Sequence, residues 1–173
     1  MNNKLRYSVM HYGLCVLIFF LLYILQSTPG MLEFWGYKPL LLAPCMISVA
    51  MLEQEYAGAL FGAFAGALCD LNANTYFGFN AMMFMLCGLA VGLLCEYMTQ
   101  RNLRNGVLFT AAFVVVLCSI NHFFQIGVYR YPHTGLYWFK KTAGTLLTTA
   151  VFAPFIYMLF DKINKGFEKY KEL

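Results

Sequence analysis

Six apolar stretches, separated by short polar segments, run along the 173-residue chain. A helix needs about 20 residues to cross the ~30 Å hydrocarbon core of a bilayer, because each residue adds about 1.5 Å. The second stretch is short, so it must borrow flanking residues, tilt little or thin the bilayer. The pattern predicts an all-α integral membrane protein, a compact bundle of six transmembrane helices in one domain over residues 1–173. The stretches cover residues 8–26, 39–52, 57–71, 78–97, 107–128 and 142–160.

The composition agrees with this interpretation. Hydrophobic residues make up 61% of the chain and charged residues only 12%, which is unlike a soluble domain. Membrane spans take up nearly the whole length, so no room remains for a soluble catalytic or sensory domain. The first stretch follows Lys4 and Arg6, but no small-x-small cleavage site comes after it. We therefore expect a retained signal-anchor helix rather than a removed signal peptide.

Basic residues indicate the orientation, because Lys and Arg collect on the cytoplasmic side of a membrane. Six spans with a cytoplasmic N-terminus place eight of them inside and four outside, whereas five spans would send the lysine-rich tail outward. Both termini are therefore expected in the cytoplasm, and the basic rim suits anionic lipid headgroups rather than nucleic acid. The inner group is Lys4, Arg6, Arg101, Arg104, Lys162, Lys165, Lys169 and Lys171, and the outer group is Lys38, Arg130, Lys140 and Lys141.

Glycines recur at every fourth position of the third stretch, at Gly58, Gly62 and Gly66, and Gly88 and Gly92 repeat the spacing in the fourth. A helix face without side-chain bulk lets two backbones approach closely within a bilayer. We expect the third and fourth helices to pack as an antiparallel hairpin, and the alternative is packing against another protein. The alanines one residue further on repeat the pattern, at Ala59, Ala63 and Ala67.

Asp70 ends the third stretch and faces an outer turn that contains Gly78. A carboxylate at a helix C-terminus opposes the helix dipole, so it is held there against a local electrostatic cost. An ionisable group at membrane depth is a functional candidate, and the alternative is an interfacial group that hydrogen-bonds the turn. That turn offers three asparagines as partners, namely Asn72, Asn74 and Asn80.

Catalytic patterns are not found in the sequence. GxSxG, HExxH and P-loop motifs are missing, and no second carboxylate lies at the depth of Asp70 to form an aspartyl protease pair. The cysteines stand at least eight residues apart, which excludes CxxC zinc or redox chemistry. We therefore expect no catalytic residue, no metal and no cofactor.

The fifth stretch carries two neighbouring polar pairs. Ser119 and His122 have i,i+3 spacing, and Asn121 and Gln125 have i,i+4 spacing, so each pair shares a helix face. Hydrogen bonding between helices is the commoner purpose of such groups in a membrane. A proton relay or a ligand site is the alternative.

The central third of the chain, from Pro39 to Glu96, contains "KPLLLAP", an acidic turn, "GALFGAFAGALCDLNANTYFGFNAM" and "GLAVGLL". This segment resembles the MreD family of rod shape-determining proteins. The family pattern is a proline-led span, then G-x-x-x-G-F-x-x-G-x-x-x-D, a turn and a further apolar helix. The residues that match it are Gly58, Gly62, Phe64, Gly66, Asp70, Gly78 and Asn80.

The resemblance implies a non-enzymatic scaffold in the bacterial cytoplasmic membrane. Its expected partners are MreC and, directly or indirectly, the glycan polymerase RodA, its class B penicillin-binding transpeptidase and MreB filaments. A chain that is almost entirely membrane helix acts by offering helix faces, loops and a basic rim to other proteins. An exposed part of the third or fourth helix, or the turn after Asp70, is therefore expected to dock a partner helix.

A second function stays open at this point. The substrate-binding subunits of energy-coupling-factor vitamin transporters are also six-helix bundles of similar length, and MreD proteins look like them in architecture. In that case Asp70, Asn80 and His122 would line a vitamin pocket, and Ala63 and Ala67 would meet the coupling subunit. A vitamin pocket needs several convergent polar groups.

Overall fold

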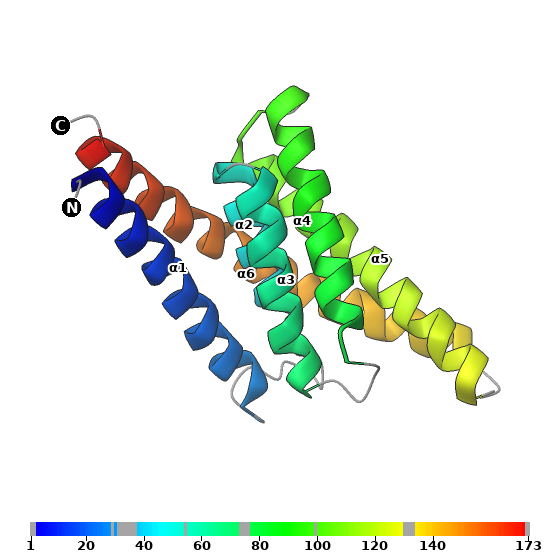
Figure 1. Ribbon diagram of the computed structural model, residues 1–173. Coiled ribbons are helices and arrows are strands. Elements are labelled where there is room, and N and C mark those ends of the chain that lie inside the picture. Colours follow the sequence, from blue (N-terminus) through cyan, green and yellow to red (C-terminus); the bar gives the residue numbers. More distant parts are fainter. Residues whose placement is uncertain are drawn as a thin grey trace.

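The computed structural model describes residues 3–28, 30, 38–53, 55–72, 77–98, 100–129 and 134–171. These residues form six helices, and each helix overlaps one of the predicted apolar stretches (Figure 1). The all-α class and the number of helices are confirmed. The helices are α1 (Asn3–Ser27), α2 (Leu42–Leu52), α3 (Glu55–Asn72), α4 (Phe79–Tyr97), α5 (Leu103–Tyr129) and α6 (Thr134–Lys171).

The chain runs back and forth along the bundle, so that both termini lie at the same end (Figure 1). We call this the terminal end, which also holds the α2–α3 and α4–α5 connections. The opposite end holds the α3–α4 connection and is called the Asp70 end. Alternating directions and short connections place α3 against α4 and α5 against α6 as antiparallel pairs.

Four helices of the described chain are long and apolar enough to cross a bilayer, which makes this a multi-pass membrane protein. Their apolar ranges are Val9–Ser27, Phe79–Tyr97, Leu103–Phe123 and Trp138–Phe167. The other two helices do not belong to this group, for different reasons. α2 has only 11 residues, and α3 carries Glu55 and Asp70 near its two ends, which lowers its average hydropathy.

The boundary of α2 differs from the predicted stretch 39–52. The helix begins at Leu42, so Pro39 precedes it and Pro44 lies in its first turn. Backbone N–H groups of the first turn have no partner within a helix, and a proline there removes no helical hydrogen bond. In a helix that began at Pro39, Pro44 would lie further in and would be expected to bend or break the first turn. The later start at Leu42 removes the reason for such a bend.

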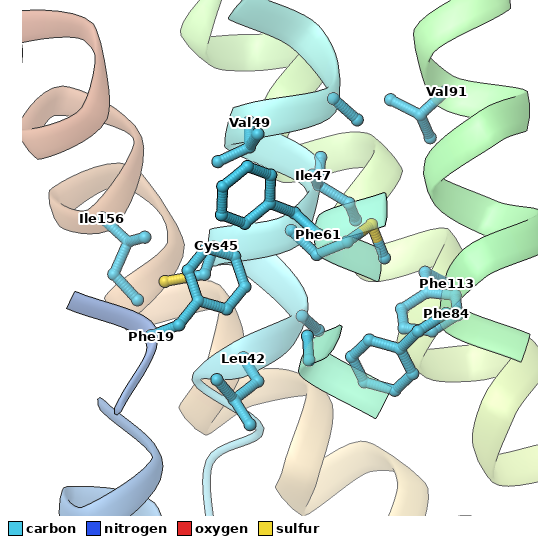
Figure 2. Close-up of a cluster of buried hydrophobic side chains, with 14 of the residues drawn as sticks. Phe19, Leu42, Cys45, Ile47, Val49, Phe61, Phe84, Val91, Phe113 and Ile156 are labelled. Atoms are coloured by element: carbon cyan, nitrogen blue, oxygen red, sulfur yellow. The ribbon is translucent and has the colours of Figure 1, made fainter. Parts of the chain in front are cut away.

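α2 forms the centre of the bundle, where it packs against all five other helices. Every residue from Leu42 to Met51 is buried, and side chains from its neighbours surround it (Figure 2). We expected this short segment to adapt to the bilayer by borrowing residues, standing upright or thinning the lipid. The structure instead encloses it in protein, so its length need not match the bilayer thickness.

Two side chains from other helices bind backbone groups at the start of α2. The N–H of Leu42 donates to Oε1 of Gln26 on α1 at 3.2 Å, and the N–H of Leu40 donates to Oγ1 of Thr149 on α6 at 3.0 Å. Backbone donors at a buried helix start need such partners, because an unpaired one costs about 1–3 kcal/mol. Helix α2 therefore depends on α1 and α6 for its beginning as well as for its packing.

Aromatic rings join the outer helices around α2. The rings of Phe84 on α4 and Phe113 on α5 lie 4.8 Å apart in an edge-to-face arrangement, and Phe19 on α1 lies 5.4 Å from Phe61 on α3. In Figure 2 the rings of Phe19 and Phe61 lie over α2, and those of Phe84 and Phe113 lie to its right. Such pairs contribute about 0.5–1.5 kcal/mol beyond their buried area.

Candidate functional site

The most extensive contact between any two helices of the described chain is that of α3 with α4. A Cβ atom added at Gly62 would lie 2.5 Å from the carbonyl oxygen of Phe84, and one at Gly66 would lie 2.4 Å from that of Asn80. At Gly88 the distance to the carbonyl oxygen of Gly58 would be 2.2 Å. Real Cβ atoms do not approach backbone atoms so closely, so any larger residue would push the helices apart.

The remaining two glycines lie on the same line of close contact between α3 and α4, which we call the glycine seam. A Cβ at Gly92 would meet Cα of Glu55 at 2.6 Å, and one at Gly58 would meet Cβ of Ala50 on α2 at 2.7 Å. The structure thus places all five predicted packing glycines between helices of this chain. Their face is already occupied and is not exposed to a partner.

Asp70 lies at the start of the same seam and binds the beginning of α4. Its Oδ2 accepts hydrogen bonds from the backbone N–H groups of Gly78 at 2.9 Å and Ala81 at 3.1 Å. Its Oδ1 accepts from Asn80 twice, from the backbone N–H at 3.1 Å and from the side-chain amide at 2.9 Å. The carboxylate is buried, and these four bonds hold the end of α3 to the start of α4.

This arrangement resolves the electrostatic cost expected for Asp70. The first N–H groups of a helix lack internal partners and carry the positive end of the helix dipole. Gly78, the residue before α4, has φ +94°, a conformation that glycine adopts without strain, and its own side chain cannot cap the helix. Asp70 from α3 caps α4 in its place, so the repulsion at one helix end is offset by attraction at the next.

The other asparagines of the turn have different positions. The side-chain amide of Asn72 donates to the hydroxyl of Ser27 at the end of α1, and Asn74 lies outside the described residues. Of the three proposed partners, Asn80 is the one that binds Asp70. The hydrogen-bonded turn was the alternative to a functional role for this carboxylate, and the described geometry has this form.

The alanine face of α3 is separate from its glycine face. Ala59, Ala63 and Ala67 are each partly exposed, and Tyr56 and Leu60 beside them are 77% and 71% exposed. Because these residues are spaced three or four apart, they form one continuous stripe along the helix. This stripe is apolar and directed away from α2 and α4, so it is available to lipid or to another helix.

The polar residues of α5 lie on the other hairpin. The hydroxyl of Ser119 donates to the carbonyl oxygen of Val115 in its own helix at 2.7 Å, and the ring of His122 lies 6.1 Å from that of Trp138 on α6. Asn121 is half-buried, and the side chain of Gln125 lies outside the described part. The roles predicted for these two pairs remain predictions.

The vitamin pocket of the alternative function gains no support from this geometry. Asp70 and Asn80 are bonded to each other and to the start of α4, whereas His122 belongs to the α5–α6 hairpin. A pocket needs polar groups that point into one cavity. The likeness to energy-coupling-factor subunits therefore stays a prediction.

The sequence indicates no role for Glu53 beyond a place in the acidic turn between the second and third stretches. The hydroxyl of Tyr12 on α1 donates to its Oε2 at 3.4 Å, and Nδ1 of His11 lies 3.5 Å from its Oε1. These partners are about forty residues away in the chain, so no local pattern connects them. Only the packing of α1 beside the α2–α3 turn reveals the contact.

Comparison with known protein families shows what the chain is similar to. The family model "rod shape-determining protein MreD" matches residues 7–163 of the 173. The comparisons with curated proteins and with solved structures give no match. The matched range extends from near the start of the first helix into the last quarter of the sixth, far beyond the central motif. The chain therefore belongs to the MreD family of rod shape-determining membrane proteins.

Proposed function

We propose that this protein is a non-enzymatic scaffold of the cell-wall elongation complex in the bacterial cytoplasmic membrane. In this role it holds MreC and, directly or through MreC, the polymerase RodA, its class B penicillin-binding transpeptidase and MreB filaments. Membership of the rod shape-determining family supports a place in this machinery. The six helices, which take up most of the chain, support action through helix contacts.

The observation that carries the proposal is the division of α3 into two small-residue faces. The glycine face is closed against α4, and Asp70 fixes the hairpin at its end. The alanine stripe of Ala59, Ala63 and Ala67 stays at the surface of this fixed hairpin. Small residues let a second backbone approach closely in lipid, where the hydrophobic effect does not drive helix association. The alanine stripe is therefore the docking face for a transmembrane helix of MreC.

The orientation belongs to the same proposal. Both termini and the α2–α3 and α4–α5 connections face the cytoplasm, because this places eight of the twelve basic residues on the inner side. All six helices then cross the membrane, with α2 shielded from lipid by its neighbours. The basic rim of the terminal end meets anionic headgroups and cytoplasmic partners.

Leucine substitutions on the alanine stripe test the proposal. Ala63→Leu and Ala67→Leu add bulk to a partly exposed face, so the bundle is expected to stay folded while a docked helix is displaced. Recovery of MreC with the tagged protein from its host's membranes should fall severalfold, and the cells should round up. Thermal unfolding of each purified variant in detergent shows whether the fold is intact.

Ala112→Leu is the matched control, because Ala112 is an exposed alanine on α5. It should leave both MreC recovery and rod shape unchanged. Folded Ala63→Leu and Ala67→Leu proteins that still recover MreC in full and support rod growth would refute the docking face. A control variant that fails equally would show that added bulk anywhere on the bundle has this effect.

A further inference from the structure

Helix α1 lies at the edge of the bundle and packs loosely against α2, α3 and α6. Its outward side is broadly exposed, and Met10 is 60% exposed. Its inward side packs against the core through apolar side chains. Cys15 and Phe19 are fully buried, and four partly buried residues also pack there, namely Ile18, Leu22, Tyr23 and Leu25. Helix α1 thus lies over one side of the bundle and covers it.

The surface beneath α1 is apolar. Figure 2 shows Phe19 lying over Cys45 of α2 and near Phe61, and its ring is 6.1 Å from that of Phe160 on α6. Phe19 therefore fills the space over α2 between α3 and α6. If α1 moved away, this side of α2 would lose its cover while the α3–α4 and α5–α6 pairs kept theirs.

One carboxylate fastens α1 at the terminal end. Both oxygens of Glu53 contact α1, Oε2 through the Tyr12 hydroxyl and Oε1 through His11 Nδ1. The ring of His11 also lies 5.0 Å from that of Phe167 on α6, and the ring of Tyr12 lies 6.1 Å from that of Phe61 on α3. At 3.4 and 3.5 Å the two polar contacts are long, and hydrogen bonds weaken at such distances.

The Asp70 end of α1 has firmer contacts. Oε1 of Gln26 accepts the hydrogen bond from the N–H of Leu42 at 3.2 Å, and the hydroxyl of Ser27 accepts one from the side-chain amide of Asn72. These bonds tie the end of α1 to the start of α2 and to the end of α3. Among the described side chains, the polar contacts of α1 are thus shorter at the Asp70 end and longer at the terminal end, where they go to one carboxylate.

We propose that α1 is a hinged cover over α2, with its pivot at Gln26 and Ser27 and its latch at Glu53. Opening the latch lets the terminal end of α1 move away from α2, α3 and α6 while the other helices keep their packing. The apolar side of α2 then becomes accessible between α3 and α6. This device is independent of the docking face on α3, which lies on a different side of that helix.

Distances between spin labels test the hinge in the full-length protein in lipid nanodiscs. With the six cysteines replaced by alanine, labels at Met10 and Tyr56 report the position of α1 relative to α3. Labels at Tyr56 and Met98 report the α3–α4 hairpin. In Glu53→Ala the open population should rise roughly tenfold, as expected for loss of one weak hydrogen bond and one further weak polar contact. The Met10–Tyr56 distances should then become longer and broader, while the Tyr56–Met98 distances stay the same.

Two further variants make the result decisive. Tyr12→Phe removes only the hydroxyl donor and should give a smaller change in the same direction, and it serves in place of Glu53→Ala if that variant misfolds. Glu55→Ala removes a carboxylate from the start of α3 and should leave the Met10–Tyr56 distances unchanged. The hinge is refuted if the latch variants keep the original distances, if both label pairs broaden together, or if Glu55→Ala has the same effect as Glu53→Ala.

Discussion

One oxygen of the Asp70 carboxylate accepts two hydrogen bonds from Asn80, from the backbone N–H at 3.1 Å and from the side-chain amide at 2.9 Å. The two residues are ten positions apart and belong to different helices. Their contact closes the α3–α4 hairpin at the point where the glycine seam begins. An acidic residue that was a candidate for a functional role therefore lies where it caps the N-terminus of the next helix.

Replacement of Asp70 by alanine should destabilise the protein by roughly 2–3 kcal/mol. Loss of a helix cap costs about 0.5–2 kcal/mol, and further buried N–H groups would be left without a partner. The free energy of unfolding can be measured by titrating the detergent-solubilised protein with sodium dodecyl sulfate and following its circular dichroism.

Asp161 provides the comparison for this measurement. Its carboxylate pairs with Lys165 of the same helix at 2.6 Å, and the lysine is exposed to solvent. Asp161→Ala should change the free energy of unfolding by no more than about 0.5 kcal/mol, since exposed i,i+4 pairs contribute little. Equal losses in the Asp70 and Asp161 variants would contradict the capping role.

The glycine seam should not tolerate even a methyl group. In Gly66→Ala and Gly88→Ala the new Cβ would lie within 2.4 Å of a backbone oxygen, so α3 and α4 must separate. Overpacking of this kind costs about 1–3 kcal/mol. The same substitution at Gly13 or Gly166 meets no atom within 4 Å and should be neutral or slightly stabilising, since alanine favours the helix. Unfolding titrations of the four variants would disprove close packing if all behaved alike.

Thr149 and Thr148 provide a neighbouring pair with different roles. Thr149 accepts the hydrogen bond from the N–H of Leu40 before α2, whereas Thr148 donates only to carbonyl oxygens of its own helix. Thr149→Val keeps the shape but leaves a backbone donor unpaired, so we expect a loss of about 1–3 kcal/mol. Thr148→Val should cost well under half as much. A similar loss in both variants would mean that the cap on α2 is unimportant.

Single cysteine residues can test whether α2 and α3 cross the membrane. Tyr56, at the terminal end, and Phe77, at the Asp70 end, are both 77% exposed. In a cysteine-free background, a membrane-impermeant maleimide should reach Tyr56→Cys only from the cytoplasm and Phe77→Cys only from outside. Labelling of both positions from outside would mean that α2 and α3 enter and leave the membrane on one side, and that only four helices cross it.

Apolar periodicity was enough to predict six helices and close packing of two of them, because a bilayer demands long apolar runs and small residues mark close contacts. The sequence could not predict the burial of α2. Eleven apolar residues have the same pattern whether lipid or protein surrounds them. The choice depended on how the five other helices are arranged, which is a property of the assembled bundle.

The features of the candidate site also divide into those that the sequence predicted and those that only the structure showed. The motif identified Gly58, Gly62, Gly66 and Asp70 as special, since glycine repeats and intramembrane carboxylates are rare without a reason. Whether Asp70 would meet a substrate, a partner or the turn depended on the position of the start of α4. The role of Glu53 was hidden altogether, because its contacts are with residues on α1.

The sequence by itself determined that this chain is an all-helical membrane protein of the MreD family, through its hydropathy, its basic residues and its central motif. Tertiary structure decided which small-residue face of α3 is used internally, which helix Asp70 caps and which segment is hidden from lipid. Hydropathy and the spacing of residues along a helix depend on neighbours within about one helical turn, so they can be recognised in the local sequence. Caps, seams and burial join residues from different helices, so they are fixed only when the helices meet.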